Sequence, residues 1–429
     1  MTSALQKAIE WTGSISCVGF CLGIGAYQGS QQFTQVVALR GVVIDAAVRS
    51  AVLAILAFVV LATISGLLLI REVFRSQDAA PRLHEGPSVA AIVPVYRDGD
   101  VLRASVNSLL ESNYRDLEVV IAAEPDDEPT LEVARELADH PKVRVLLNDR
   151  PGSKASAINR AVARVDADYF CSLDADERVD PEFVPIAMYQ LVEADRDVFQ
   201  ARRVPRANGP VEMLAYCERL LFHASYKLVE PLGFTYCRTS SVAFTREAFE
   251  TVGGLDDLLT EDIDFAHTCF RKRLDVHQAR YVTNEMEAPH SLRDLWGQRK
   301  RWRIGHIQVF QKAITGGFEP SGLRGTASTI RLAVSLLASV FMVSLVSKVA
   351  VLVYYGFGGI AVLSVVPVCI TVLPILYRDY ELGHVQRLSP TLVFAPLIYP
   401  GFGLVTIRCA FEYFLSWDGE WFQVEKTGA

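Results

Sequence analysis

Three polar segments between residues 172 and 302 contain the side chains of a group-transfer site. Thr260-Glu261-Asp262 offers carboxylates, and a carboxylate can accept a proton from a hydroxyl. Gln298-Arg299-Lys300-Arg301-Trp302 combines amide, guanidinium and indole groups, which suit a pyrophosphate leaving group and a flat polar ring. Asp174 and Asp176 follow an apolar run and could hold a divalent metal. Together these groups predict transfer of a sugar from a nucleotide diphosphate to a hydroxyl at a membrane.

The composition is too apolar for an ordinary soluble enzyme, since 51% of the 429 residues are hydrophobic. The excess lies in two end regions and leaves a middle region of average polarity. The net charge of −7 gives no support to nucleic-acid binding, which usually leaves a basic footprint. We therefore expect a membrane protein with a polar central domain and no nucleic-acid partner.

The apolar end regions contain candidate membrane segments at Thr12–Gly29, Ala51–Ile70, Leu332–Tyr354, Gly359–Tyr377 and Leu392–Phe414. A helix needs about 20 apolar residues to cross a hydrocarbon core of roughly 30 Å. Arginines crowd the ends that flank the middle domain, and basic flanks favour the cytoplasm. We therefore expect a multi-pass protein of the cell membrane, with membrane helices within residues 1–75 and 328–416, a cytoplasmic domain between them, and a tail over residues 417–429.

The middle region alternates short apolar runs with helical patterns, which is typical of parallel βαβ units in an α/β domain. The expected strands are Val89–Val93, Leu117–Ala122, Val143–Leu147 and Tyr169–Leu173, and the expected helices are Val101–Leu110, Thr130–Leu137 and Ala155–Val165. Ligands of such sheets bind beyond the carboxyl ends of the strands. Polar clusters follow all four strands, and they include Tyr96, Glu124, Lys154 and Asp174. This arrangement predicts a nucleotide cleft.

Lys154 has two possible roles. Gly152-Ser153-Lys154 fails the spacing of a phosphate loop, because Ala155 stands where that loop has Ser or Thr. A lysine at the start of a helix could still contact a phosphate. The alternative is a solvated lysine in the first helical turn.

These segments, in this order, resemble the family 2 glycosyltransferases of the GT-A (Rossmann-like) fold, in the membrane-embedded branch that includes hyaluronan, chitin and cellulose synthases. The resemblance covers roughly residues 88–310, within a domain that we place at residues 86–318. It is carried by a first strand at Ala91–Tyr96, a Lys154–Asn159 segment, an Asp-x-Asp at Asp174–Asp176, the Thr260–Asp262 triplet and the Gln298–Trp302 motif.

The resemblance implies a role for each site residue. Asp262, with Glu261, would act as the catalytic base of an inverting transfer. The donor, a nucleotide sugar expected to be a UDP-sugar, would contact Pro94, Tyr96, Lys154, Asp174, Gln298, Arg299, Arg301 and Trp302. Mg²⁺ or Mn²⁺ would bind at Asp174 and Asp176. Trp302 would also offer its ring to a lipid-linked or glycan acceptor, unless it serves as an interfacial membrane anchor.

Three departures from the family pattern leave alternatives open. Glu124 or Asp127 would take over base and ribose contacts, because the usual Asp-Asp-Gly-Ser is missing. Arg238 replaces a glycine at the acceptor mouth, which favours single addition over processive synthesis. The tail segment Trp421–Thr427 faintly resembles a cytoplasmic gating loop of cellulose synthases, whereas three C-terminal spans would put it outside. One of these two expectations must be wrong.

Two stretches near residues 211–229 and 292–310 are amphipathic, and we expect helices that lie on the membrane plane. Packing onto the sheet domain is the alternative for the first.

The leading functional hypothesis is an inverting membrane glycosyltransferase that adds one sugar or a short chain. A processive polysaccharide synthase, a catalytically silent membrane scaffold and a transporter are the alternatives, the transporter being disfavoured by the large polar domain.

Overall fold

The computed structural model describes residues 11–13, 15–20, 23, 42–149, 152–316, 322–419, 422, 424 and 426–428. Half of the first candidate membrane segment, Thr12–Gly29, therefore lies outside the described residues. In chain order the elements are α2 (Val42–Val73), β1 (Val89–Val95), α3 (Gly99–Leu110), β2 (Leu117–Ala123), α4 (Glu128–Leu137), β3 (Val143–Leu147), α5 (Lys154–Arg164), β4 (Tyr169–Ser172), α6 (Phe183–Met188), η1 (Tyr189–Glu193), β5 (Val198–Pro205), α7 (Pro210–Tyr226), η2 (Glu230–Leu232), β6 (Val242–Thr245), α8 (Arg246–Val252), α9 (Glu261–Lys272), β7 (Val276–Met286), α10 (Leu292–Ile314), α11 (Gly322–Tyr354), α12 (Gly358–Leu363), α13 (Val366–Glu381), η3 (Pro390–Leu397) and α14 (Ile398–Leu415).

The strands form one seven-stranded sheet in the order β3-β2-β1-β4-β6-β5-β7. β1 to β4 are parallel, with Ala91 opposite both Val119 and Cys171. The α/β fold that the sequence predicts, with parallel βαβ units, is confirmed. β6 is antiparallel to both β4 and β5, while β7 pairs in parallel with β5. The sequence reading did not identify these last three strands.

Helices cover both faces of the sheet, so the central strands are buried on both sides. On β1, Ala91 and Val93 face a core formed with α3, α4 and α6, whereas Ala90 and Ile92 face a core formed with α5, α8 and α9. A strand buried on both faces has no polar alternation, which explains its continuous apolar sequence.

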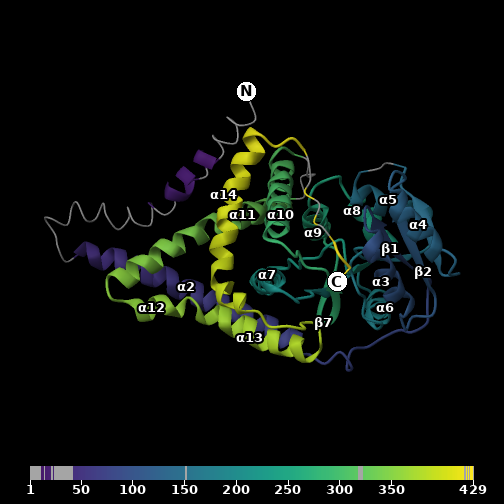
Figure 1. Ribbon diagram of the computed structural model, residues 1–429, viewed down its shortest axis with the longest axis horizontal. Coiled ribbons are helices and arrows are strands. Elements are labelled where there is room, and N and C mark those ends of the chain that lie inside the picture. Colours follow the sequence, from purple (N-terminus) through teal and green to yellow (C-terminus); the bar gives the residue numbers. More distant parts are fainter. Residues whose placement is uncertain are drawn as a thin grey trace.

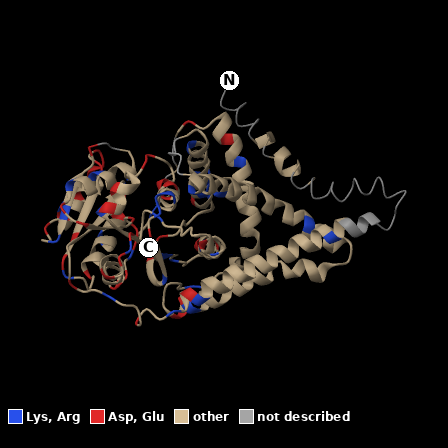
Figure 2. Ribbon diagram, turned by 180° about the vertical axis from the view of Figure 1, so that it is seen from behind, with Lys and Arg blue, Asp and Glu red and all other residues tan. Residues whose placement is uncertain are grey.

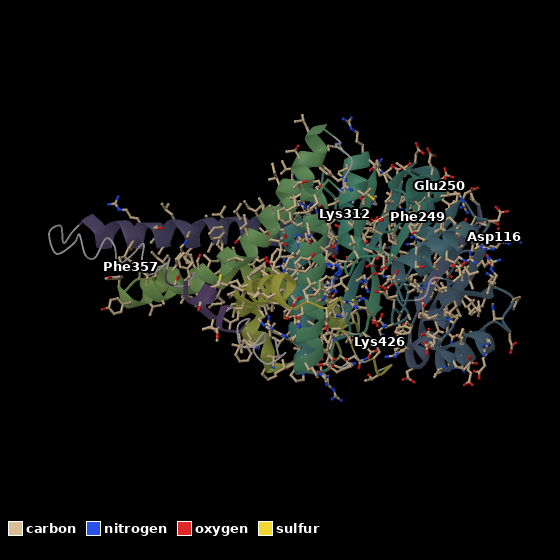
Figure 3. The ribbon with its side chains drawn as sticks, turned by 90° about the horizontal axis from the view of Figure 1, so that it is seen from above. Asp116, Phe249, Glu250, Lys312, Phe357 and Lys426 are labelled. Atoms are coloured by element: carbon tan, nitrogen blue, oxygen red, sulfur yellow. The ribbon has the colours of Figure 1, made fainter. Side chains whose placement is uncertain are left out.

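A bundle of long apolar helices extends from one side of the sheet domain (Figure 1). By length and composition, four helical segments among the described residues could cross a membrane: Ala47–Val73, Gly322–Tyr354, Gly358–Glu381 and Pro390–Leu415. Figure 2 shows the long helices nearly free of charged residues over most of their length. In Figure 3, Phe357 marks the end of this bundle farthest from the sheet domain.

The amphipathic stretches form α7 and α10, which lie between the sheet domain and the apolar bundle. Leu220 and Leu221 of α7 share a core with Leu69 of α2 and Ile375 of α13. This face of α7 is therefore packed against the apolar bundle. The expectation that α7 and α10 lie on the membrane plane stays a prediction.

α14 runs across the two intermediate helices. Its Tyr399 hydroxyl donates to the Leu221 carbonyl at 2.9 Å, and near its other end Glu412 pairs with Lys300 of α10 at 2.5 Å. Gly403 permits a close crossing with α11, because a Cβ there would overlap the Ser339 carbonyl oxygen. Both ends of α14 thus contact the helices that border the sheet domain.

Candidate active site

A cavity of about 490 Å³ opens at the carboxyl ends of β1, β2 and β4. Its walls come from six or more separate segments of the chain. Among the residues that the sequence assigned to a site, those that line it are Pro94, Tyr96, Glu124, Lys154, Asp174, Asp176, Arg238, Glu261, Asp262, Gln298, Arg301 and Trp302. Asp127 and Arg299 do not line the cavity. The structure therefore brings most of the expected site together.

Asp174 lies between two cations. Its Oδ1 accepts from Lys154 Nζ at 2.5 Å, and its Oδ2 accepts from Arg203 Nη2 at 2.5 Å. Burial opposes ionisation, but the two positive charges outweigh it and hold the pKa of Asp174 well below its usual range. Lys154 starts α5, whose first turn is capped by the Ser153 hydroxyl. Lys154 thus points into the cavity, and the solvated alternative is wrong.

Asp176 and Glu177 are more deeply buried. The Asp176 side chain is 9% exposed and lies 3.9 Å from Lys426 Nζ, and burial raises its pKa. Glu177 is fully buried, accepts from the Ser241 hydroxyl at 2.9 Å and pairs with Arg203. Burial raises the pKa of Glu177 to about 7. Arg203 therefore forms ion pairs with both Asp174 and Glu177, the acidic residues that flank Asp176.

The residues described by the structure contain no group of three or more His, Cys, Asp or Glu side chains placed to hold a metal. The carboxylates of Asp174 and Asp176 are hard oxygen donors at the cavity wall. Such a pair fits a cation that takes its remaining ligands from substrate phosphates and water, as Mg²⁺ commonly does.

Glu261 and Asp262 start α9, so their charges lie at its positive end. Glu261 accepts from the Thr239 hydroxyl at 2.7 Å and lies 3.6 Å from Lys154 Nζ. Burial raises the pKa of Glu261. Asp262 has looser contacts, at 3.4 Å to the Tyr236 hydroxyl and 3.5 Å to Arg238 Nη1. Its side chain is 20% exposed, so Asp262 is the better placed of the two to meet a substrate.

The basic-aromatic motif lies on α10. Trp302 lines the cavity between two guanidinium groups, Arg219 at 5.3 Å and Arg299 at 4.7 Å from its ring centre. The alternative of an interfacial membrane anchor is therefore wrong. Arg299 pairs through Nε with Glu218 at 2.7 Å and supports the indole from behind. The expected donor contact of Arg299 is wrong for this geometry, because the carboxylate of Glu218 already holds its side chain away from the cavity.

Glu124 and Asp127, the two alternatives for base and ribose contacts, lie in different places. Glu124 lines the cavity and accepts from Asn148 Nδ2 at 2.8 Å and from the Gly152 amide at 3.0 Å. Asp127 precedes α4 and accepts from the Arg97 amide at 2.5 Å. The Asp127 side chain therefore supports the loop after β1 instead of facing the cavity.

The tail also lines the cavity, on the same side as the sheet domain (Figure 3). Lys426 Nζ donates to Asp98 at 2.7 Å, and Thr427 donates through its amide to Glu287 at 2.7 Å. Gly297 of α10 leaves room for the Phe422 ring, which a Cβ would overlap. The expectation that three C-terminal spans leave this segment outside is wrong, because the chain returns to the domain directly after α14.

Sequence reasoning missed Arg203, Arg219 and Lys426 as cavity residues. The only available signal for Arg203 was a pair of arginines inside an apolar strand. Lys426 lies in the tail segment Trp421–Thr427. This segment faintly resembles a cytoplasmic gating loop, but three C-terminal spans would have placed it on the other side of the membrane.

Comparison with known proteins agrees with this geometry. Residues 90–253 match the model of Glycosyl transferase family 2. Poly-beta-1,6-N-acetyl-D-glucosamine synthase of Staphylococcus aureus is 24% identical over 248 residues, which are 56% of this chain and 60% of that protein. Chondroitin synthase of Pasteurella multocida is 30% identical over 112 residues, covering 26% of this chain and 12% of the relative. The chain thus spans less than two thirds of either curated relative.

Among solved structures, mannosyltransferase PcManGT from Pyrobaculum calidifontis, in complex with GDP-Man and Mn²⁺, has the same fold. The TM-score is 0.57 at 19% identity, and the match covers 87% of this chain and all of the other. The sheet domain is therefore a GT-A fold flanked by apolar helices. Residues 90–253 therefore match the family 2 glycosyltransferases, and both curated relatives are polysaccharide synthases by name.

Proposed function

We propose that this protein is an inverting membrane glycosyltransferase that moves a sugar from a nucleoside-diphosphate sugar to a hydroxyl of a lipid-linked or glycan acceptor. The observation that carries the proposal is the convergence of Asp174, Asp176, Asp262 and Trp302 on one cavity. Two carboxylates suited to a metal, a separate carboxylate suited to a base and an aromatic platform are the groups that such a transfer needs.

Asp262 is the proposed base. It accepts the proton of the attacking hydroxyl while that oxygen bonds to the anomeric carbon and the bond to the diphosphate breaks. A single direct displacement inverts the anomeric centre. The loose contacts and partial exposure of Asp262 support this role, since a base must stay accessible to its substrate. Glu261, held by Thr239, would instead fix the start of α9.

The donor half of the cavity is proposed to bind the nucleotide. Lys154, Arg301 and Gln298 can donate hydrogen bonds to the diphosphate, and Glu124 can accept from the ribose or base. Mg²⁺ or Mn²⁺ at Asp174 and Asp176 would neutralise the leaving diphosphate without a proton. The Mn²⁺ in the PcManGT complex supports a divalent ion. A UDP-sugar remains our expectation for the donor.

The proposed topology follows from where the helices end. We propose that α2, α11 and α13 cross the membrane and that α14 stays on the side of the catalytic domain, the cytoplasm. The contacts of α14 with Leu221 and Lys300 support this arrangement, because both belong to helices that border the domain. An epitope inserted at Gly356 should be accessible from outside intact cells, and one at Gly419 only after permeabilisation. The opposite pattern at Gly419 would contradict the topology.

A second candidate function is processive polymer synthesis, which the names of both curated relatives favour. A silent scaffold is disfavoured because the carboxylates expected to hold the metal, Asp174 and Asp176, and the expected base, Asp262, all line the cavity. The test uses purified protein in lipid with a panel of UDP- and GDP-sugars, each with Mg²⁺ or Mn²⁺. Nucleotide release and product size are measured for wild type and for Asp262→Asn. Nucleotide release by wild type but not by Asp262→Asn supports glycosyl transfer. Product length separates single addition from processive synthesis. The absence of nucleotide release with every donor would favour the scaffold.

A further inference from the structure

Arg219 is a buried cation at the acceptor end of the cavity. It lies on α7, is 5% exposed, and lines the cavity together with Met286 and Trp302. Its Nη1 has no hydrogen-bond partner among the described residues, and its Nη2 donates to the Met286 sulfur at 3.7 Å. Thioether sulfur is a weak acceptor, so the guanidinium retains most of its capacity to donate.

Two other buried arginines, Arg202 and Arg299, have carboxylate partners. Arg202 forms a two-point pair with Asp379 at 2.9 and 2.5 Å, and Arg299 pairs with Glu218. Glu218 precedes Arg219 in the chain, yet its carboxylate is taken by Arg299. Among the described residues no carboxylate forms an ion pair with Arg219.

The surroundings of Arg219 are positively charged. Burial lowers its pKa well below the usual value, and the charges of Arg238, Arg203 and Arg299 lower it further. An unpaired buried charge destabilises a fold, so such a group is normally matched by a counter-ion. In this cavity the missing counter-ion can come from a ligand.

We propose that Arg219, together with Arg238, binds an anionic group of the acceptor, a carboxylate or a phosphate, beside the hydroxyl that Asp262 deprotonates. This inference rests on the proposed glycosyl transfer. The acceptor is favoured over the donor because Arg238 reaches Asp262, whereas Lys154 pairs with Asp174 at the donor carboxylates. The Trp302 ring under Arg219 would then hold the sugar that bears the anion.

The first test measures stability, with Arg219→Met against the matched control Arg202→Met. Both replace a buried arginine by a side chain of similar length. Arg219→Met should raise Tm, because an unpaired cation is removed, whereas Arg202→Met should lower it by leaving Asp379 unpaired. Inorganic phosphate or glucuronate should raise the Tm of wild type and leave that of Arg219→Met unchanged. The proposal is overturned if Arg219→Met lowers Tm and if phosphate and glucuronate raise the Tm of this variant as much as that of wild type. Arg219 would then have a structural role.

The second test measures acceptor preference. Each pair of acceptors differs in one group only. Glucose is compared with glucuronate to test a carboxylate, and a neutral sugar is compared with its phosphate ester to test a phosphate. Wild type should favour one anionic member by about 10- to 100-fold in kcat/KM, the range expected for a charged hydrogen bond, and Arg219→Met should lose this preference. Arg219→Lys should recover part of it. Equal use of charged and neutral acceptors by wild type would overturn the proposal.

Donor measurements separate this inference from the proposed function. Arg219→Met should bind UDP or GDP as wild type does, because Arg219 is assigned to the acceptor and not to the donor diphosphate. Weaker nucleotide binding would assign the anion to the donor diphosphate and overturn the acceptor assignment. If wild type releases no nucleotide from any donor, the proposed function fails, and the anion-dependent Tm still decides whether Arg219 binds anions.

Discussion

The Nη1 atom of Arg238 lies 3.5 Å from Oδ2 of Asp262, and the Arg238 side chain stacks on the Tyr236 ring at 5.4 Å. The cation therefore covers one approach to the proposed base. The backbone amide of Arg238 donates to the side-chain oxygen of Gln200 at 2.6 Å, and this hydrogen bond connects Arg238 to strand β5. The family motif that this segment resembles has a glycine at the position of Arg238, so we expect the pair to connect the chemistry at Asp262 with the width of the acceptor mouth.

Asp262→Asn should abolish transfer and leave nucleotide affinity nearly unchanged. The amide keeps the size of the side chain but cannot accept the proton, and general-base catalysis contributes about 10²–10⁴-fold. Steady-state kinetics and nucleotide titration measure the two quantities. The Glu250→Gln variant, at an exposed side chain that does not line the cavity, is the control and should behave as wild type. A parallel loss of nucleotide affinity would make Asp262 a donor ligand instead.

Arg238→Gly should change product length or acceptor preference more than donor affinity. Removal of the side chain widens the mouth and frees Asp262 from its cation. Arg238→Met keeps most of the volume without the charge, so comparison of the two variants separates size from charge. Product sizing by gel or mass spectrometry is the measurement. If several acceptors give unchanged products with both variants, the gating role is refuted and processive synthesis becomes the favoured function.

The first four strands were predictable because their signal is local. Each is an apolar run separated from the next by a helix-length segment, and the structure gives β3 the predicted bounds of Val143–Leu147. β5 lacks such a signal, because Arg202 and Arg203 interrupt it. Their partners Asp379 and Asp174 lie far away in the chain, so burial of two adjacent arginines could not be foreseen.

The site was predictable where motifs stand at the ends of strands or at the starts of helices. Asp174, Asp262 and Lys154 are positioned in this way. Arg299 was assigned incorrectly because a motif fixes which residues are close but not which way each side chain points. Lys426 was missed because it reaches Asp98 across 328 positions of sequence.

Asp176→Asn should remove turnover and the metal dependence of nucleotide binding while the protein stays folded. The loss follows from removing one of two hard oxygen ligands. Nucleotide affinity measured with and without Mn²⁺ should show a large difference in wild type and little in the variant. Asp174→Asn should behave similarly, with the added loss of the counter-charge for Lys154 and Arg203. Asp126→Asn, at an exposed carboxylate outside the cavity, is the control, and full metal-dependent activity of Asp176→Asn would contradict the assignment.

His290 should make docking of the tail depend on pH. Its Nδ1 lies 2.8 Å from Glu212 and its Nε2 lies 2.7 Å from Glu287, the carboxylate that also holds Thr427. Burial opposes protonation, but hydrogen bonds to Glu287 and Glu212 outweigh it and raise the pKa of His290 above 6.5. Because the folded-state pKa exceeds the unfolded one, the charged imidazole contributes stability fully below about pH 6.5 and loses it as the pH rises through the raised pKa.

His290→Gln tests this prediction, because glutamine retains hydrogen bonding but carries no titrating charge. Burial opposes ionisation of Glu287 as well, but the hydrogen bonds that Glu287 accepts outweigh burial and lower its pKa below 4.5. Glu287 therefore stays ionised between pH 6 and pH 8.5. The Tm difference between wild type and variant should be largest near pH 6 and should shrink toward pH 8.5. The protection factors of the Thr427 and Gly428 amides, which correct for the intrinsic rise of hydrogen exchange with pH, should fall over the same interval in wild type alone. A Tm difference that stays constant from pH 6 to 8.5 would mean that His290 acts through packing and not through its charge.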